Sequence, residues 1–149
     1  MWRMLVGYFC AVLVFGQTSA VPTAGPGYAE LDQAYKALTA KNYDAAIDEF
    51  QKAIKIVPDR PAIRKDLAYT YLKIGNNQAA RDQFAEAMRL DPKDEHLALE
   101  YAFLCYETKQ PILARRVFDR YRKTNSTAAE AFENIDRPLR EGIDRKSVV

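Results

Sequence analysis

The chain has 149 residues, which is enough for one ordinary domain and too little for two. It carries 22 Lys and Arg against 20 Asp and Glu, and a net charge of +2 argues against a dedicated nucleic-acid-binding protein. Two Cys and one His are too few for a four-ligand zinc site built from nitrogen and sulfur, and they leave little material for Cys–His or Ser–His catalysis.

The first twenty residues have the three parts of a secretory signal. Arg3 gives a basic start, residues 4–15 are apolar, and Thr18-Ser19-Ala20 supplies small residues at the end. The apolar run is shorter than the roughly twenty residues that a membrane span needs. We therefore expect cleavage after Ala20, export to the periplasm or the medium, and no stable membrane span afterwards. An uncleaved anchor is the alternative. Residues 21–27, rich in Pro and Gly, predict a flexible lead-in.

The body of the chain repeats with a period of about 34 residues, and five columns of identical residues share that spacing. The columns are Ala34/Ala68/Ala102, Ala46/Ala80/Ala114, Phe50/Phe84/Phe118, Ala53/Ala87 and Pro58/Pro92. Small residues allow two helices to approach closely, and a Phe fills the space beside them. The columns therefore predict stacked pairs of helices.

Residues 61–94 show how each copy is built. Apolar residues at helical spacing predict a first helix around residues 63–74 and a second around residues 80–88. Gly75-Asn76-Asn77 breaks the chain between them, and Asn77 is placed to cap the second helix. Asp91-Pro92 ends that helix, because proline lacks the N–H and restricts the residue before it.

This pattern resembles the tetratricopeptide repeat family, in a bacterial-type protein with a signal peptide. The resemblance implies an all-α, right-handed α-solenoid with about three helix–turn–helix repeats and further C-terminal helices. The repeats are placed at residues 27–60, 61–94 and 95–125, within a domain at 28–125. In the third copy Tyr121 replaces the expected small residue, and no proline ends the second helix.

Residues 126–149 predict trailing helices that look like a truncated fourth repeat. The segment from Thr127 to Glu130 is a capping-box pattern that should start a helix through Ile135. Arg137-Pro138 should interrupt this helix, since proline removes a backbone donor, before a further helix around Ile143.

The last six residues, 144–149, fit nothing before them. A common sequencing-adapter sequence translates in one reading frame to this same hexapeptide followed by a stop codon. On that interpretation Ile143 is the last native residue and the protein continues through a fourth repeat or more. A short natural tail is the alternative, and the codons for residues 144–149 decide between the two.

Candidate binding residues follow from the resemblance, because in this family the first helix of each repeat lines a concave groove. The corresponding positions are Leu31, Tyr35 and Leu38 in the first copy, Lys65, Tyr69, Leu72 and Lys73 in the second, and Leu99, Phe103 and Tyr106 in the third. The aromatic residues Tyr35, Tyr69 and Phe103 are again one period apart, which predicts a ladder of stacked rings. The ladder either faces a protein partner or packs between the copies.

A subclass of the family holds the C-terminal carboxylate of a peptide with Asn and basic residues. Here Tyr35, Tyr69 and Phe103 fill the Asn position, and Lys65 and Lys73 are the only matching cations. That specificity is therefore not carried over to this chain. The expected ligand is an apolar or amphipathic segment.

The remaining reactive residue types have structural interpretations. A basic run on the last repeat helix is expected to be a solvated face rather than a phosphate or lipid site. It consists of Arg115, Arg116, Arg120, Arg122 and Lys123. His96 is expected to be an exposed residue at a helix start, and Cys105 a buried small hydrophobe. No Gly-rich phosphate loop, GxSxG or HExxH motif is present, so we expect no enzyme activity, cofactor or metal.

The sequence as a whole predicts an exported, non-enzymatic interaction module or scaffold. It would bind a peptide or protein segment in the groove, and no nucleic acid. The alternative is an N-terminal piece of a larger exported repeat protein with a structural role or a missing downstream domain. A small enzyme is the third and weakest hypothesis, since no nucleophile–base–acid set is visible.

Overall fold

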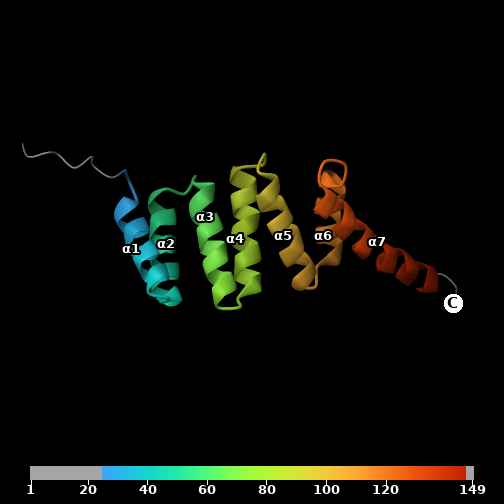
Figure 1. Cartoon of the computed structure of the whole chain (residues 1–149), viewed down its shortest axis with the longest axis horizontal. Helices are drawn as coiled ribbons and strands as arrows, with labels where there is room; N and C mark the ends of the chain where they lie inside the picture. The colour runs from blue at the N-terminus through green and yellow to red at the C-terminus, as the bar shows by residue number, and fades with distance from the viewer. Residues whose placement is uncertain (1–24, 147–149) are drawn as a thin grey trace, which may run out of the picture.

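The computed structural model describes residues 25–146, with the side chains of the last helix described to Arg137 and at Arg140. The helices are α1 (Tyr28–Thr39), α2 (Tyr43–Ile56), α3 (Pro61–Lys73), α4 (Asn77–Leu90), α5 (Glu95–Glu107), α6 (Pro111–Tyr121) and α7 (Ser126–Lys146). They form a single row in which each helix runs antiparallel to its neighbours (Figure 1). The predicted all-α repeat fold is confirmed, and the described range contains no strand. The predicted signal at residues 1–20 lies outside the described residues.

None of the helices in the described part of the chain is both long and apolar enough to cross a membrane.

The repeated small and aromatic columns form the core of the row. Every Ala and Phe in these columns is fully buried, from Ala34 in α1 to Phe118 in α6. In the middle of the row Phe84 packs with Ala80 and Ala87 of its own helix and with Leu97 of the next repeat. The Ala residues bring the helix backbones close, so that one Phe per repeat fills the space between them.

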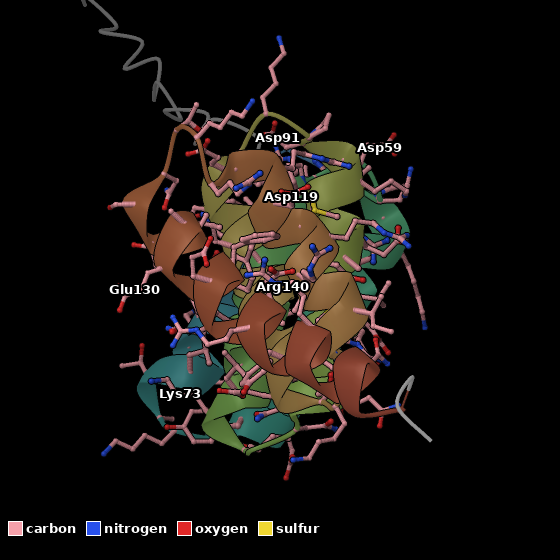
Figure 2. The ribbon with its side chains drawn as sticks, turned by 90° about the vertical axis from the view of Figure 1, so that its right-hand side faces the viewer. Asp59, Lys73, Asp91, Asp119, Glu130 and Arg140 are labelled. Atoms are coloured by element: carbon pink, nitrogen blue, oxygen red, sulfur yellow. The ribbon has the colours of Figure 1, made fainter. Side chains whose placement is uncertain are left out.

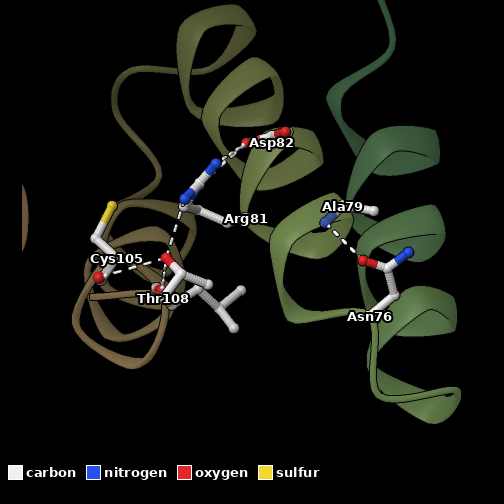
Figure 3. A network of polar contacts seen from close by, with 7 residues as sticks. Asn76, Ala79, Arg81, Asp82, Cys105 and Thr108 are labelled. Carbon is white, nitrogen blue, oxygen red and sulfur yellow. Dashed lines mark hydrogen bonds and ion pairs between the residues drawn. The ribbon is translucent and has the colours of Figure 1, made fainter. Parts of the chain in front are cut away.

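Asparagine side chains start the second helix of the first two repeats. The Asn42 side chain accepts a hydrogen bond from the Ala45 N–H at 3.2 Å. Asn76 does the same with Ala79 at 3.1 Å (Figure 3). The predicted cap at Asn77 is therefore wrong by one residue. A side-chain oxygen reaches the N–H three residues onward from the position just before the helix, and Asn77 already lies in the first turn.

The turn between the paired helices uses one left-handed residue per repeat. Lys41, Gly75 and Lys109 have φ values of 58°, 75° and 64°. They are one period apart, so the same turn recurs three times. Gly75 adopts this conformation without steric strain, whereas Lys41 and Lys109 adopt it against the usual preference of L-residues.

The trailing segment is one helix rather than two. The Asn125 side chain accepts from the Ala128 N–H at 3.1 Å, so α7 begins at Ser126 and not at the predicted Thr127 cap. The interruption predicted at Arg137-Pro138 does not occur, because α7 continues to Lys146.

Ion pairs on both sides of Pro138 explain why α7 continues. Asp136 is only 4% exposed, and its carboxylate accepts from Arg115 of α6 at 2.5 Å and from Arg140 of α7 at 2.7 Å. The pair with Arg140 spans Pro138 within the same helix. These charged contacts, together with the burial of Phe132 and Ile135, offset the one backbone hydrogen bond that proline removes.

The basic run on α6 is partly structural rather than a wholly solvated face. The guanidinium groups of Arg115 and Arg122 lie 4.9 and 4.7 Å from the centre of the Phe132 ring. Arg122 also pairs with Asp119 at 2.7 Å. The expectation is therefore wrong for Arg115, which joins α6 to α7. The basic run in the sequence does not reveal that Arg115 faces a buried carboxylate, because that carboxylate belongs to Asp136 on α7.

Candidate binding groove

Residues of α1 and α3 line one hollow and residues of α5 and α7 line another, and we call the face formed by these four helices the groove. Two hollows lie on it. The first lies between α1 and α3, has a volume of about 130 Å³, and is lined by Tyr35, Leu38, Asp66, Tyr69, Thr70 and Lys73. The second, which we call the α5–α7 pocket, has a volume of about 340 Å³ and is lined by Phe103, Tyr106, Phe118, Ala131, Asn134 and Ile135.

The structure places six of the ten predicted groove residues at these two hollows. They are Tyr35, Leu38, Tyr69 and Lys73 at the first, and Phe103 and Tyr106 at the second. Leu31, Leu72 and Leu99 are instead half-buried against the core clusters. Lys65 lies at a separate hollow on the α3–α5 side, with Asp91 and Asp94.

The three periodic aromatic rings are held within their own repeats. Tyr35 meets Phe50 edge-on with ring centres 5.5 Å apart, and Tyr69 meets Phe84 at 5.1 Å. Phe103 meets Phe118 at 4.9 Å. In the described part of the chain these rings do not stack on one another, so the predicted ladder is wrong. Each ring instead meets the buried Phe of its own repeat's second helix, and such an edge-to-face contact is favourable.

Two of the three rings also link their repeat to the next one through a hydroxyl group. The Tyr35 hydroxyl donates to the Asp66 carboxylate at 2.5 Å. The Tyr69 hydroxyl lies 3.2 Å from Glu100 and 3.0 Å from Nε2 of His96. Sequence reasoning missed Asp66 and Glu100, although they too are one period apart and each follows its Tyr by 31.

The tyrosine hydroxyls remain donors over the ordinary pH range. Burial, followed by the hydrogen bond and charge of Asp66, raises the pKa of Tyr35 to about 12. Burial and then Glu100 raise the pKa of Tyr69 to about 12. His96 is exposed at the start of α5 as expected, but it has a role in this inter-repeat contact.

The third ring has no such link. Phe103 carries no hydroxyl, and α7 begins earlier than one full period after α5, since α3, α5 and α7 start at Pro61, Glu95 and Ser126. Relative to a full period, the shorter step shifts the residues along α7 by about one helical turn. Ala131, Asn134 and Ile135 then stand at the α5–α7 pocket where Asp66, Tyr69 and Thr70 stand at the first hollow. A small Ala therefore replaces the carboxylate.

A polar network holds α4 and α5 together away from the groove (Figure 3). Arg81 of α4 donates to the Thr108 hydroxyl at 3.0 Å and to the Asp82 carboxylate at 2.7 Å. The Thr108 hydroxyl donates to the Leu104 carbonyl at 2.6 Å. Cys105 is fully buried beside this network, and burial raises the pKa of its thiol. The network thus fixes the frame that carries Phe103 and Tyr106.

Charged side chains of both signs border the groove. Figure 2 views the row from its α7 end, and Lys73 of α3 and Glu130 of α7 lie on the same side of the molecule. Glu130 borders a small hollow next to the α5–α7 pocket, with Phe103 and Ala131. Lys73 borders the first hollow.

Comparison with protein families identifies the class of this chain. Two family models, both described as Tetratricopeptide repeat, match residues 37–85 and 65–129, which together make up more than half of the chain. The chain belongs to the tetratricopeptide repeat family. A search of curated proteins finds no match.

Solved structures show the same fold. The first repeat domain of Spaghetti (RPAP3), bound to the HSP90 peptide SRMEEVD, is 17% identical with a TM-score of 0.61, over 76% of this chain and 92% of that one. The Sgt2 domain from Aspergillus fumigatus is 18% identical with a TM-score of 0.60, over 79% and 82%. Yeast Tom70 is 16% identical with a TM-score of 0.69, over 81% of this chain and 26% of that one. At these identities the likeness is one of fold.

Proposed function

We propose that this protein is a non-enzymatic interaction module that binds a segment of a partner protein in the groove. The observation that carries the proposal is a set of exposed aromatic rings on a rigid frame. Tyr35, Phe103 and Tyr106 expose 46%, 40% and 55% of their surface, although Tyr35 and Phe103 are each fixed against a buried Phe. Rigid, exposed aromatic residues beside hollows favour binding of protein partners. The Spaghetti (RPAP3) domain, which has the same fold and is bound to an HSP90 peptide, supports peptide binding as the function.

The proposed ligand is an apolar or amphipathic segment rather than an acidic peptide end. Asp66 and Glu100 both lie along the groove, and their carboxylates accept hydrogen bonds from Tyr35 and Tyr69. A peptide carboxylate placed over this row would meet like charge. The apolar lining of the two hollows instead suits aliphatic or aromatic side chains.

Binding in the groove is tested by mapping a selected peptide onto the chain. A randomised peptide library is selected against the purified chain, and the tightest peptide is titrated into isotope-labelled protein. We expect the largest backbone NMR shifts on α1, α3, α5 and the first half of α7. Shifts concentrated on α2, α4 and α6 would contradict groove binding.

We also propose that the protein is exported through the signal at residues 1–20. The support is the sequence pattern, a basic start, an apolar run and Thr18-Ser19-Ala20. N-terminal sequencing of the exported protein is expected to begin at Val21. A mature protein that still begins at Met1 would favour a membrane-anchored form instead.

A further inference from the structure

The geometry points to the α5–α7 pocket as the selective site of the groove. We propose that it takes one large apolar side chain of the partner segment, with an Arg or Lys next to that side chain held by Glu130. This assignment rests on the proposed function, since it names the part of the partner that the groove recognises.

The α5–α7 pocket is open because it lacks the contact that closes the first hollow. In the first hollow the Tyr35 hydroxyl and the Asp66 carboxylate meet across the gap between α1 and α3. At the α5–α7 pocket Phe103 lacks the hydroxyl and Ala131 lacks the carboxylate, so the equivalent hydrogen bond cannot form there. The volume is accordingly about 340 Å³, against about 130 Å³.

The lining suits an apolar side chain. The floor is formed by Phe118, which is fully buried, and by Ile135, which is 6% exposed. The walls are the exposed rings of Phe103 and Tyr106. Asn134 is exposed at the rim, where its side-chain amide can both donate to and accept from the backbone of a bound segment. An apolar pocket with one polar group at its edge is the usual form of a side-chain binding site.

We call the apolar side chain that enters the pocket the anchor. The negative charge of Glu130 beside the pocket specifies the residue next to the anchor in the partner segment. Glu130 is exposed and shares a hollow with Phe103, Ala131 and Asn134. Among the described residues no cation lies within salt-bridge distance of its carboxylate, whereas Asp119 of α6 and Asp136 of α7 are both paired. A basic residue of the partner complements this charge, while an acidic one is repelled.

The test uses the full chain and the randomised peptide library. We expect the selected peptides to contain a Leu, Met, Phe or Trp beside an Arg or Lys. Ala131→Leu fills the pocket. It is expected to lower the affinity for the tightest selected peptide roughly ten- to hundredfold, because the apolar side chain of the peptide no longer enters the pocket. Ala85→Leu is the matched control, since Ala85 is half-buried on α4 and lines none of these hollows. Its peptide affinity is expected to stay at the wild-type value.

A second variant tests the charge without filling the pocket. Glu130→Lys changes an exposed side chain, and its selected peptides are expected to carry Asp or Glu beside the anchor in place of Arg or Lys. Groove-bound peptides that lack an apolar anchor, or that bind Ala131→Leu as tightly as wild type, would overturn the assignment and leave the proposed function standing. If the chain selects no peptide at all, the proposed function fails as well.

Discussion

Replacing Phe84 with alanine is expected to lower the free energy of unfolding by about 3–5 kcal/mol. Phe84 is fully buried at the centre of the row, and the Tyr69 ring packs edge-on against it at 5.1 Å. Its closest companions include Ala68, Ala80 and Ala87, whose methyl groups cannot extend to fill the space. The cavity left by the substitution therefore persists, and its cost adds to the lost burial.

Urea denaturation followed by circular dichroism measures this effect. Arg89→Gln is the control, because Arg89 is exposed on the same helix and makes only a surface pair with Glu86 at 2.9 Å. That substitution is expected to cost less than about 1 kcal/mol. Equal stabilities for Phe84→Ala and Arg89→Gln would show that the repeat register is wrong.

Replacing Arg115 with alanine is expected to lower the free energy of unfolding by about 1–3 kcal/mol. Asp136 is 4% exposed and, among the described residues, would keep Arg140 as its one charged partner. The Phe132 ring would also lose a guanidinium group 4.9 Å from its centre. Hydrogen exchange should report the loss first in α7, since Arg115 joins α6 to that helix.

A double variant separates the effect of the Arg115–Asp136 ion pair from the effect of lost side-chain packing. Arg115→Met combined with Asp136→Leu removes both charges and keeps apolar volume at the junction. Apolar replacement of a buried ion pair is often neutral or stabilising, so most of the lost stability should return. If the double variant is less stable than either single variant, the ion pair itself does not account for the junction.

The repeating part of the fold could be predicted from the sequence because its core depends on short-range periodicity. The Ala and Phe columns recur at a fixed period and mark the buried positions, and the structure buries every one of them. The continuous α7 could not be predicted in this way. Pro138 is a strong local signal for a break, and the ion pairs of Asp136 that oppose it depend on Arg115, a residue in another helix.

The groove could be predicted only in part. The positions of Tyr35, Tyr69 and Phe103 follow from the period, but their contacts depend on how near the second helix lies. The equal spacing from Tyr35 to Asp66, and from Tyr69 to Glu100, was available as a signal for the inter-repeat contacts. The α5–α7 pocket depends on the shortened third repeat, which the sequence indicates only through Tyr121 in place of a small residue and the absence of a proline after the second helix.

Site-specific photocrosslinking in living cells tests most directly that a partner protein occupies the groove. A photoreactive amino acid replaces Lys73, in the last turn of α3 at the groove, or Lys55, in the last turn of α2, a second helix of the repeats. Both side chains are exposed, and Lys55 lines neither of the two hollows of the groove. A discrete protein crosslinked from position 73 and absent from position 55 is the predicted result. A partner crosslinked from position 55 and absent from position 73 would contradict binding in the groove.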